Sequence, residues 1–205
     1  LELIEADVQK KIDHAFNVAR NGDTPEPKFS AKRALPAQKS EYTGASEKRD
    51  LTMLEAMREA LKNQLKLNDE TILLGQDIED PKGDVFGLTR GLSTAFPNQV
   101  RNSALAENTI LGVSTGLALT GKKPIAFMQF SDFLPVAYNH LISEIGAMFW
   151  RTNGQWESPV VVMAIAGAYR PGLGPYHAQT LESIVAHIPG IDVFMPSTAE
   201  DAAGL

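Results

Sequence analysis

The chain has 205 residues, 43% of them hydrophobic, a net charge of -6 and no cysteine. This length suits one full core with an appended segment, and the lack of thiols excludes a disulfide framework and a cysteine nucleophile and fits a reducing compartment. The longest apolar run, 159–167, is only strand-sized, and the acidic excess lies entirely beyond residue 50, so we expect a cytoplasmic protein that binds neither membranes nor nucleic acid.

Residues 1–22 have the pattern of one amphipathic helix, with Gly22 as its C-terminal stop. Its apolar stripe consists of Ile4, Val8, Ile12, Phe16 and Ala19. A single helix cannot bury such a stripe alone, and 23–50 follows as a polar, proline-containing linker. We therefore predict that 1–22 is the C-terminal helix of a preceding domain. An N-terminal arm that packs on this domain or on a partner subunit is an equal alternative.

From residue 51 onward, helical and strand periods alternate. A capping box formed by Thr52 and Glu55 opens the first helix. The expected strands are 71–75, the extended run 99–106, 124–130, 159–167 and 191–195, and the later helices are 90–96, 108–120, one within 134–150, and 180–187. This alternation, with strands apolar on both faces, predicts an α/β domain in which helices flank a parallel sheet on both faces.

The last predicted helix is opened by a second capping box, formed by Ser197 and Glu200. It stops at Leu205 after barely two turns. We therefore expect the domain over 51–205 to be truncated at its C-terminal end.

Polar side chains gather where the predicted strands end. Glu107 follows the extended run and opens an apolar helix, while 129–133 and the loop 168–180 follow two further strands. In parallel sheets, functional groups collect at the carboxyl ends of strands, and an acid in apolar surroundings is costly unless something pairs with it. These groups therefore predict a site, although an acid at a helix N-terminus is more often there because the helix dipole favours it.

Short motifs spread over 51–205 carry a family resemblance. They are ILLGQDI at 72–78, VFGLTRGL at 85–92, LAE at 105–107, QFSDF at 129–133, and HAQ at 177–179 with HIPG at 187–190. Together they resemble the pyrimidine-binding domain in the β subunit of thiamine diphosphate-dependent 2-oxo acid dehydrogenases, which has a transketolase-like thiamine-binding fold. Residues 1–22 resemble the last helix of the family's α subunit, which implies a fused α–β chain.

The resemblance implies roles for five residues. The acid matching Glu107 hydrogen-bonds a ring nitrogen of the cofactor's aminopyrimidine and promotes the tautomer that removes the thiazolium proton. Phe133 would stack on the pyrimidine, Gln129 would touch its edge, and Leu105 would pack beneath the cofactor. His177 matches the histidine that binds the 2-oxo acid and helps pass the acyl group to lipoyl-lysine. The catalytic residues implied are thus Glu107 and His177.

Thiamine enzymes of this group hold diphosphate and Mg²⁺ through a Gly-Asp-Gly motif followed by Asn, which this sequence lacks. The resemblance therefore implies that a separate α-type domain supplies the metal and diphosphate site, that this fragment ligates no metal, and that it is inactive in isolation. It also implies a lipoyl acyltransferase core as a partner in a multienzyme complex. Apolar surface left exposed by the missing domain predicts a homodimer or a larger assembly.

Departures from the family pattern keep alternatives open. Gln76 stands where the family has a glutamate that is thought to relay protons, and Asn102-Ser103-Ala104 replaces its Asp-Thr-Pro. The stretch 129–133 is nearer to the branched-chain enzymes, which favours 3-methyl-2-oxobutanoate as the substrate over pyruvate. A non-catalytic assembly module of this fold is the alternative from another class; transketolase and deoxyxylulose phosphate synthase fit less well.

Overall fold

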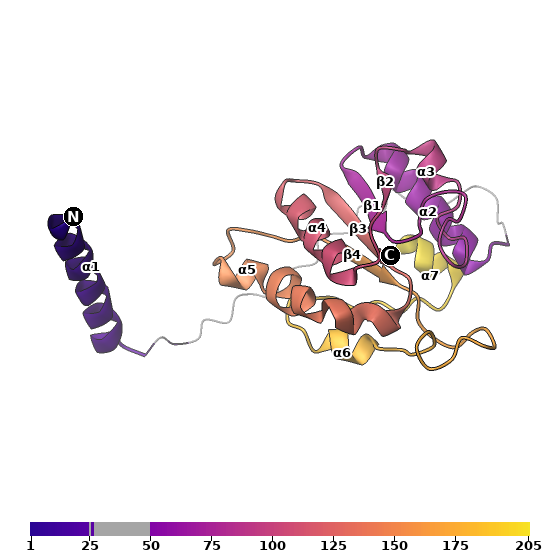
Figure 1. The fold of residues 1–205 in the computed structure, drawn as a ribbon. Coiled ribbons are helices and arrows are strands. Elements are labelled where there is room, and N and C mark those ends of the chain that lie inside the picture. The colour runs from indigo at the N-terminus through magenta and orange to yellow at the C-terminus, as the bar shows by residue number, and fades with distance from the viewer. Residues whose placement is uncertain (25, 27–49) are drawn as a thin grey trace. The chain divides into compact units, whose positions relative to one another are not determined.

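The computed structural model describes residues 1–24, 26 and 50–205, so most of the predicted linker at 23–50 lies outside the described residues. The chain divides into two compact units, Leu1–Ser46 and Glu47–Leu205, each of which is described by itself (Figure 1). No helix in the described part is long and apolar enough to cross a membrane.

The described part of the first unit is dominated by one helix, α1 (Glu2–Asn21), which confirms the helix predicted over 1–22. The helix ends at Gly22, whose backbone is extended rather than left-handed. Every residue of α1 is exposed, including Phe16 at 61%. The predicted apolar stripe is therefore exposed on this helix.

The second unit is built on a four-stranded sheet made of β1 (Thr71–Gly75), β2 (Val100–Asn102), β3 (Lys123–Met128) and β4 (Val161–Ala164). The strand order is β2-β1-β3-β4, and every neighbouring pair is parallel. This confirms the parallel sheet expected from the alternation of strands and helices.

Helices cover both faces of this sheet (Figure 1). They are α2 (Met53–Leu67), α3 (Leu92–Ala95), α4 (Glu107–Leu119), α5 (Met148–Arg151), α6 (Glu182–Ala186) and α7 (Ala199–Gly204), with a 3-10 helix η1 (Ser131–Ala137) and a π-helix η2 (His140–Gly146). The capping box of α2 is confirmed, because the Thr52 hydroxyl accepts from the Glu55 N–H and the Glu55 carboxylate accepts from the Thr52 N–H at 2.9 Å. The predicted α/β architecture is therefore confirmed.

The core has two halves, one on each face of the sheet. One half joins α2 and α3 to the strands, and the other joins α4, η1 and η2 to the strands. β3 contributes to both halves, because Phe127 packs into the first while Ala126 and Met128 pack into the second. This alternation follows from the two-residue period of a strand.

Three local predictions were wrong. No strand forms at 191–195, where only Ile191 packs against the core and Phe194 and Met195 are exposed, so an apolar run without a paired neighbouring strand stays irregular. The last helix is capped by Thr198, whose hydroxyl accepts from the Asp201 N–H, because α7 begins at Ala199, one residue later than the Ser197–Glu200 box requires. The single helix expected within 134–150 is divided among η1, η2 and α5.

Candidate active site

The carboxyl ends of all four strands lie along one edge of the sheet. The register aligns Gly75 of β1 with Asn102 of β2 and with Phe127 of β3, and it aligns Met128 of β3 with Ala164 of β4. The chain leaves β1 toward β2 on one side and returns to β3 on the other, so the order reverses between β1 and β3. Such a switch point is where open α/β sheets bind ligands.

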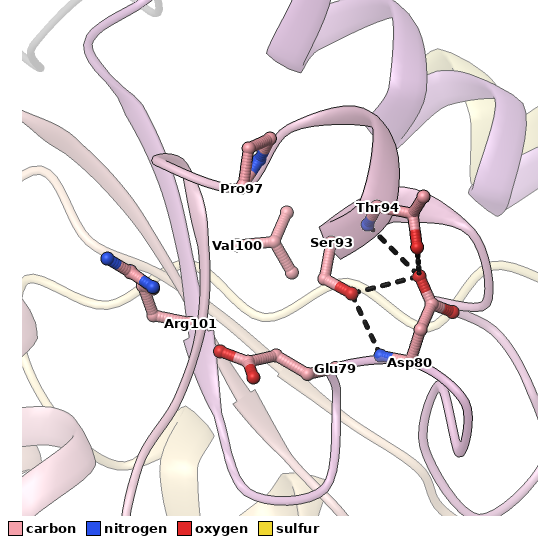
Figure 2. A pocket seen from close by; sticks show the side chains of 7 residues that line it. All are labelled: Glu79, Asp80, Ser93, Thr94, Pro97, Val100 and Arg101. Atoms are coloured by element: carbon pink, nitrogen blue, oxygen red, sulfur yellow. Dashed lines mark hydrogen bonds between the residues drawn. The ribbon is translucent and has the colours of Figure 1, made fainter.

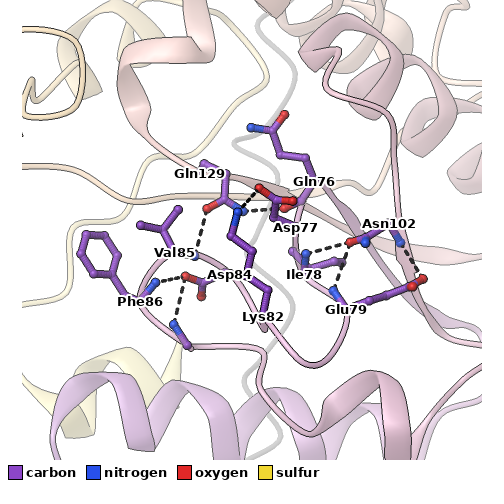
Figure 3. A network of polar contacts seen from close by, with 11 residues as sticks. Gln76, Asp77, Ile78, Glu79, Lys82, Asp84, Val85, Phe86, Asn102 and Gln129 are labelled. Atoms are coloured by element: carbon purple, nitrogen blue, oxygen red, sulfur yellow. Dashed lines mark hydrogen bonds and ion pairs between the residues drawn. The ribbon is translucent and has the colours of Figure 1, made fainter.

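The loop that follows β1, residues 76–89, is tied to the sheet edge by two side-chain amides, those of the buried Gln129 and of Asn102 (Figure 3). The Gln129 Nε2 donates to the Gln76 carbonyl, and its Oε1 accepts from the Val85 N–H at 3.3 Å. The Asn102 Oδ1 accepts from the Ile78 N–H at 2.8 Å. Both polar ends of Gln129 are therefore engaged inside the protein, and its predicted contact with a cofactor stays a prediction.

Asp84 organises the second half of the same loop. Its carboxylate is buried and accepts a hydrogen bond from the Phe86 N–H (Figure 3). It also accepts from the N–H groups of Gly87 at 3.2 Å and Leu88 at 2.7 Å. Burial raises the pKa of Asp84, and the backbone donors oppose that rise. This arrangement gives the loop a fixed shape.

Glu107 is the first residue of α4 and is only 8% exposed. Within the described part of the chain, its carboxylate has no hydrogen bond or ion pair. The N-terminal end of the helix dipole favours an acid at this position. Gln76 is similar, because its Oε1 is buried without a partner among the described residues. Oxygens that lack partners therefore follow β1 and β2 on the same edge of the sheet.

Aromatic rings surround His177. Its imidazole lies edge-to-face with Phe130 at 4.8 Å between centroids and with Phe133 at 5.5 Å, and Phe130 also contacts Phe86 at 5.9 Å. The structure thus brings Phe133 and His177 together, although the stacking role of Phe133 stays a prediction. Leu105 and Glu107 lie instead at the junction of β2 and α4, with Leu105 80% exposed.

The start of η1 holds the segment that follows His177. The Asp132 Oδ1 accepts from the Ala178 N–H at 3.4 Å and from the Gln179 N–H at 3.3 Å, and its Oδ2 accepts from the Gln179 N–H at 3.3 Å. The Ser131 hydroxyl donates to the Gln179 carbonyl at 2.6 Å. Sequence reasoning missed this contact, and the only signal was the placement of Ser131 and Asp132 shortly after the end of β3.

Arg170 was also missed by sequence reasoning. Its guanidinium carbon lies 5.6 Å from the centroid of the Phe86 ring, a cation–π contact. The side chain has no ion pair among the described residues. Because Phe86 contacts Phe130, and Phe130 contacts His177, a cation lies beside the same aromatic group as the imidazole.

A pocket beside α3 is lined by Glu79, Asp80, Ser93, Thr94, Pro97, Val100 and Arg101 (Figure 2). Asp80 is satisfied within it: the Thr94 hydroxyl and the Gly91 N–H, with help from Ser93, lower its pKa to about 2. Its donors belong to α3 and to the residue before it, so we assign Asp80 to holding that helix. No group of three or more His, Cys, Asp or Glu side chains within residues 1–24, 26 and 50–205 is arranged to hold a metal ion.

Comparison with known proteins identifies the class. The family "Transketolase, pyrimidine binding domain" matches residues 49–205, and the chain belongs to this family. A solved structure titled "Split gene transketolase, inactive beta4 tetramer" shares the fold, with a TM-score of 0.59 and 23% identity, over 75% of this chain and 45% of that one.

Among curated proteins, the chain is similar to β subunits of 2-oxo acid dehydrogenases, which confirms the resemblance seen in the sequence. It is 40% identical over 156 residues to the 2-oxoisovalerate dehydrogenase subunit beta of Bacillus subtilis (strain 168), and 36% identical over 158 residues to the pyruvate dehydrogenase E1 component subunit beta of the same organism. Each match covers 76% of this chain and 47% of the relative. The chain therefore spans about half the length of these relatives.

Proposed function

We propose that this chain supplies the pyrimidine-binding half of a thiamine diphosphate site in a 2-oxo acid dehydrogenase, with Glu107 and His177 as its catalytic residues. The observation that carries the proposal is Glu107, a residue only 8% exposed whose carboxylate has no protein partner among the described residues. An acid on a largely buried residue has limited contact with water, and a ligand that supplies a hydrogen-bond donor compensates for this.

The residues present fit an aminopyrimidine. Such a ring carries an amino group that donates and ring nitrogens that bind a donor or share a proton, while the edge offers the Glu107 carboxylate and the orphaned Gln76 Oε1. Leu105, Gln129 and Phe133 would complete the contact with the ring. When bound, thiamine diphosphate supplies the electron sink that accepts electrons as carbon dioxide leaves the substrate.

Glu107 would orient the ring and hold a proton at one of its nitrogens. Its place at the start of α4 suits this task, because the rigid helix fixes the backbone from which the carboxylate extends. A bound ring would exclude the water that competes for the same hydrogen bond.

His177 would bind the 2-oxo acid and move a proton during acyl transfer. The edges of two phenylalanine rings restrict its imidazole, and its nitrogens can donate or accept a hydrogen bond. Arg170, beside the same aromatic group, adds a positive charge that suits a substrate with a carboxylate.

A separate α-type domain would hold Mg²⁺ and the diphosphate. We further propose that 51–205 pairs with such a domain, that 1–22 is its last helix and 23–50 the linker, and that the assembly is a homodimer serving a lipoyl acyltransferase core in the cytoplasm. The similarity to a 2-oxoisovalerate dehydrogenase subunit favours 3-methyl-2-oxobutanoate, and pyruvate is the second candidate because a pyruvate dehydrogenase subunit follows at 36% identity.

A non-catalytic assembly module is the second candidate function. Gln76 favours it, because an amide cannot relay a proton as a carboxylate does. The partnerless Glu107 opposes it, since an assembly module has no need for a buried acid without a partner.

Turnover tests the proposal in the natural protein that contains this chain. We expect thiamine- and Mg²⁺-dependent decarboxylation of 3-methyl-2-oxobutanoate, and a loss of about a hundredfold or more in Glu107→Gln and His177→Ala. The matched controls are Glu200→Gln, an exposed acid in the first turn of α7, and His187→Ala, an exposed histidine. Unchanged turnover in Glu107→Gln would remove the mechanism, and no turnover with any 2-oxo acid would favour the assembly module.

Binding gives a second readout that does not need the complete enzyme. We would titrate the 205-residue chain with 4-amino-5-hydroxymethyl-2-methylpyrimidine, the ring portion of the cofactor, and follow backbone amide signals by NMR. The amides of Gln76 and Glu107 should shift on binding, and Glu107→Gln should weaken the response whereas Glu200→Gln should not.

A further inference from the structure

The backbone of Gln179, two residues after His177, is hydrogen-bonded at both its N–H and its C=O group; we call these bonds to Ser131 and Asp132 the grip. Gln179 donates its N–H to both carboxylate oxygens of Asp132 at 3.3 Å, and its carbonyl accepts from the Ser131 hydroxyl at 2.6 Å. The Ala178 N–H donates to Asp132 as well, at 3.4 Å. Two consecutive residues of η1 thus hold two consecutive residues of the loop.

The grip is itself anchored in the sheet region. Ser131 is buried, and its N–H donates to the Ile165 carbonyl at 2.7 Å, just beyond the end of β4. The Gln179 carbonyl also accepts from the Gly167 N–H at 3.3 Å. The segment after His177 is therefore tied both to η1 and to the chain that leaves β4.

The segment before His177 has a different setting. Tyr169 and Tyr176 are 86% and 71% exposed, and Gly172 and Gly174 adopt left-handed backbone conformations between them. The contacts that hold this side of the loop are the Arg170–Phe86 contact and one bond from the Gln179 side chain to the Pro175 carbonyl at 2.7 Å, as far as the described residues go. The position of His177 hence depends mainly on the anchored side.

We propose that Asp132 is a positioning residue, assisted by Ser131, which holds the Ala178–Gln179 backbone so that the His177 imidazole stays against Phe130 and Phe133. The importance of that imidazole rests on the proposed function. The geometry commits the Asp132 carboxylate to backbone N–H groups, so it acts through His177 and does not touch the reacting atoms.

Two substitutions of Asp132 distinguish a role as hydrogen-bond acceptor from a role that depends on its negative charge. A single oxygen, Oδ1, accepts from both N–H groups, so the amide oxygen of Asp132→Asn can replace it, whereas Asp132→Ala has no acceptor. Ser131→Ala removes the second half of the grip. Asp192→Ala is the matched control, because Asp192 is an exposed aspartate in the same unit.

The test uses NMR of the 205-residue chain. Two readouts are followed: hydrogen exchange of the Ala178 and Gln179 amides, and the ring C–H signals of His177, which the currents of the neighbouring phenylalanine rings displace. We expect Asp132→Ala to speed exchange about tenfold and to move the His177 signals toward those of a free histidine. Asp132→Asn and Asp192→Ala should remain near wild type, and Ser131→Ala should lie between the two.

A folded Asp132→Ala chain with unchanged His177 signals would overturn the proposal, and so would an Asp132→Asn chain that moves as far as Asp132→Ala. If Asp132→Ala does not fold, the test is made with Ser131→Ala. Displaced His177 signals in that variant would support the proposal, and unchanged signals would overturn it. These readouts need neither cofactor nor substrate. An intact grip in a protein without turnover would therefore count against the proposed function alone, and a failed grip in an active protein against Asp132 alone.

Discussion

Two loops border the same edge of the sheet, and they are held in different ways. The loop 76–89 is fixed along its length by Gln129, Asn102 and the buried carboxylate of Asp84. The loop 168–180 is gripped mainly at its C-terminal end, by Ser131 and Asp132. The candidate site therefore combines one rigid loop, 76–89, with one loop that is anchored on one side, 168–180. A rigid loop suits the positioning of a cofactor ring, and a loop that is anchored on one side can move to admit a substrate or a partner.

Asp84→Ala should have the largest effect on folding. The substitution removes the carboxylate that accepts hydrogen bonds from three backbone N–H groups and leaves those groups without an acceptor. We therefore expect the free energy of unfolding to fall by about 3 kcal/mol. Asp84→Asn keeps an acceptor oxygen and should cost less. Urea denaturation measures both. A loss below about 0.5 kcal/mol in Asp84→Ala would mean that this loop is not the rigid one.

Gln129→Ala should have the second-largest effect on stability. The substitution removes the bonds to Gln76 and Val85 and leaves a small void, so we expect a loss of about 2 kcal/mol in the free energy of unfolding. Gln155→Ala, at an exposed position, is the control and should be neutral. If both variants melt at the same temperature, the tie between β3 and the loop contributes nothing.

Asp80 should give a smaller effect that depends on pH. Hydrogen bonds from Thr94 and Gly91 lower its pKa from 3.8 to about 2. Its contribution is therefore fully present above pH 4 and is lost as the pH falls toward 2, by no more than about 1 kcal/mol because water screens the group. Asp80→Asn should flatten the stability profile between pH 5 and 2. Burial gives the pKa of Asp84 the opposite direction, so Asp84→Asn should not flatten it.

Arg170→Gln should have the smallest effect on stability, within about 0.5 kcal/mol, because the side chain is exposed and lies on the less anchored part of its loop. If the proposed function holds, its KM for a 2-oxo acid should still rise severalfold through the loss of a positive charge. Lys62→Gln, an exposed cation on α2, should change neither quantity. A large loss of stability in Arg170→Gln would erase the contrast between the loops.

The helices α1 and α2 show what periodicity can predict. Both carry an apolar stripe and both form, yet α2 buries Leu61 and Leu65 while every residue of α1 is exposed. The Thr52–Glu55 box was predictable because its partners lie three residues apart. The strand expected at 191–195 was not, because a strand also needs a neighbouring strand to pair with.

In the candidate site, too, some features could be predicted from the sequence and others could not. Residue type, place after strands and the family pattern singled out Glu107, Phe133 and His177 as candidates, and their roles stay predictions. The bonds that shape the site could not be predicted: Asp132 meets partners 46 and 47 residues away, and Gln129 meets Val85 at a separation of 44. No local pattern encodes such a pairing.

The sequence by itself determined the alternation of elements, the parallel sheet and the chemical groups available at its edge, because these follow from local periodicity and residue chemistry. Only the tertiary structure decided that Glu107 lies in a largely buried position without a protein partner among the described residues, that His177 contacts two phenylalanine rings, and that the Asp132 carboxylate accepts hydrogen bonds from backbone N–H groups. Burial and pairing depend on what the rest of the chain brings alongside, and folding alone settles that.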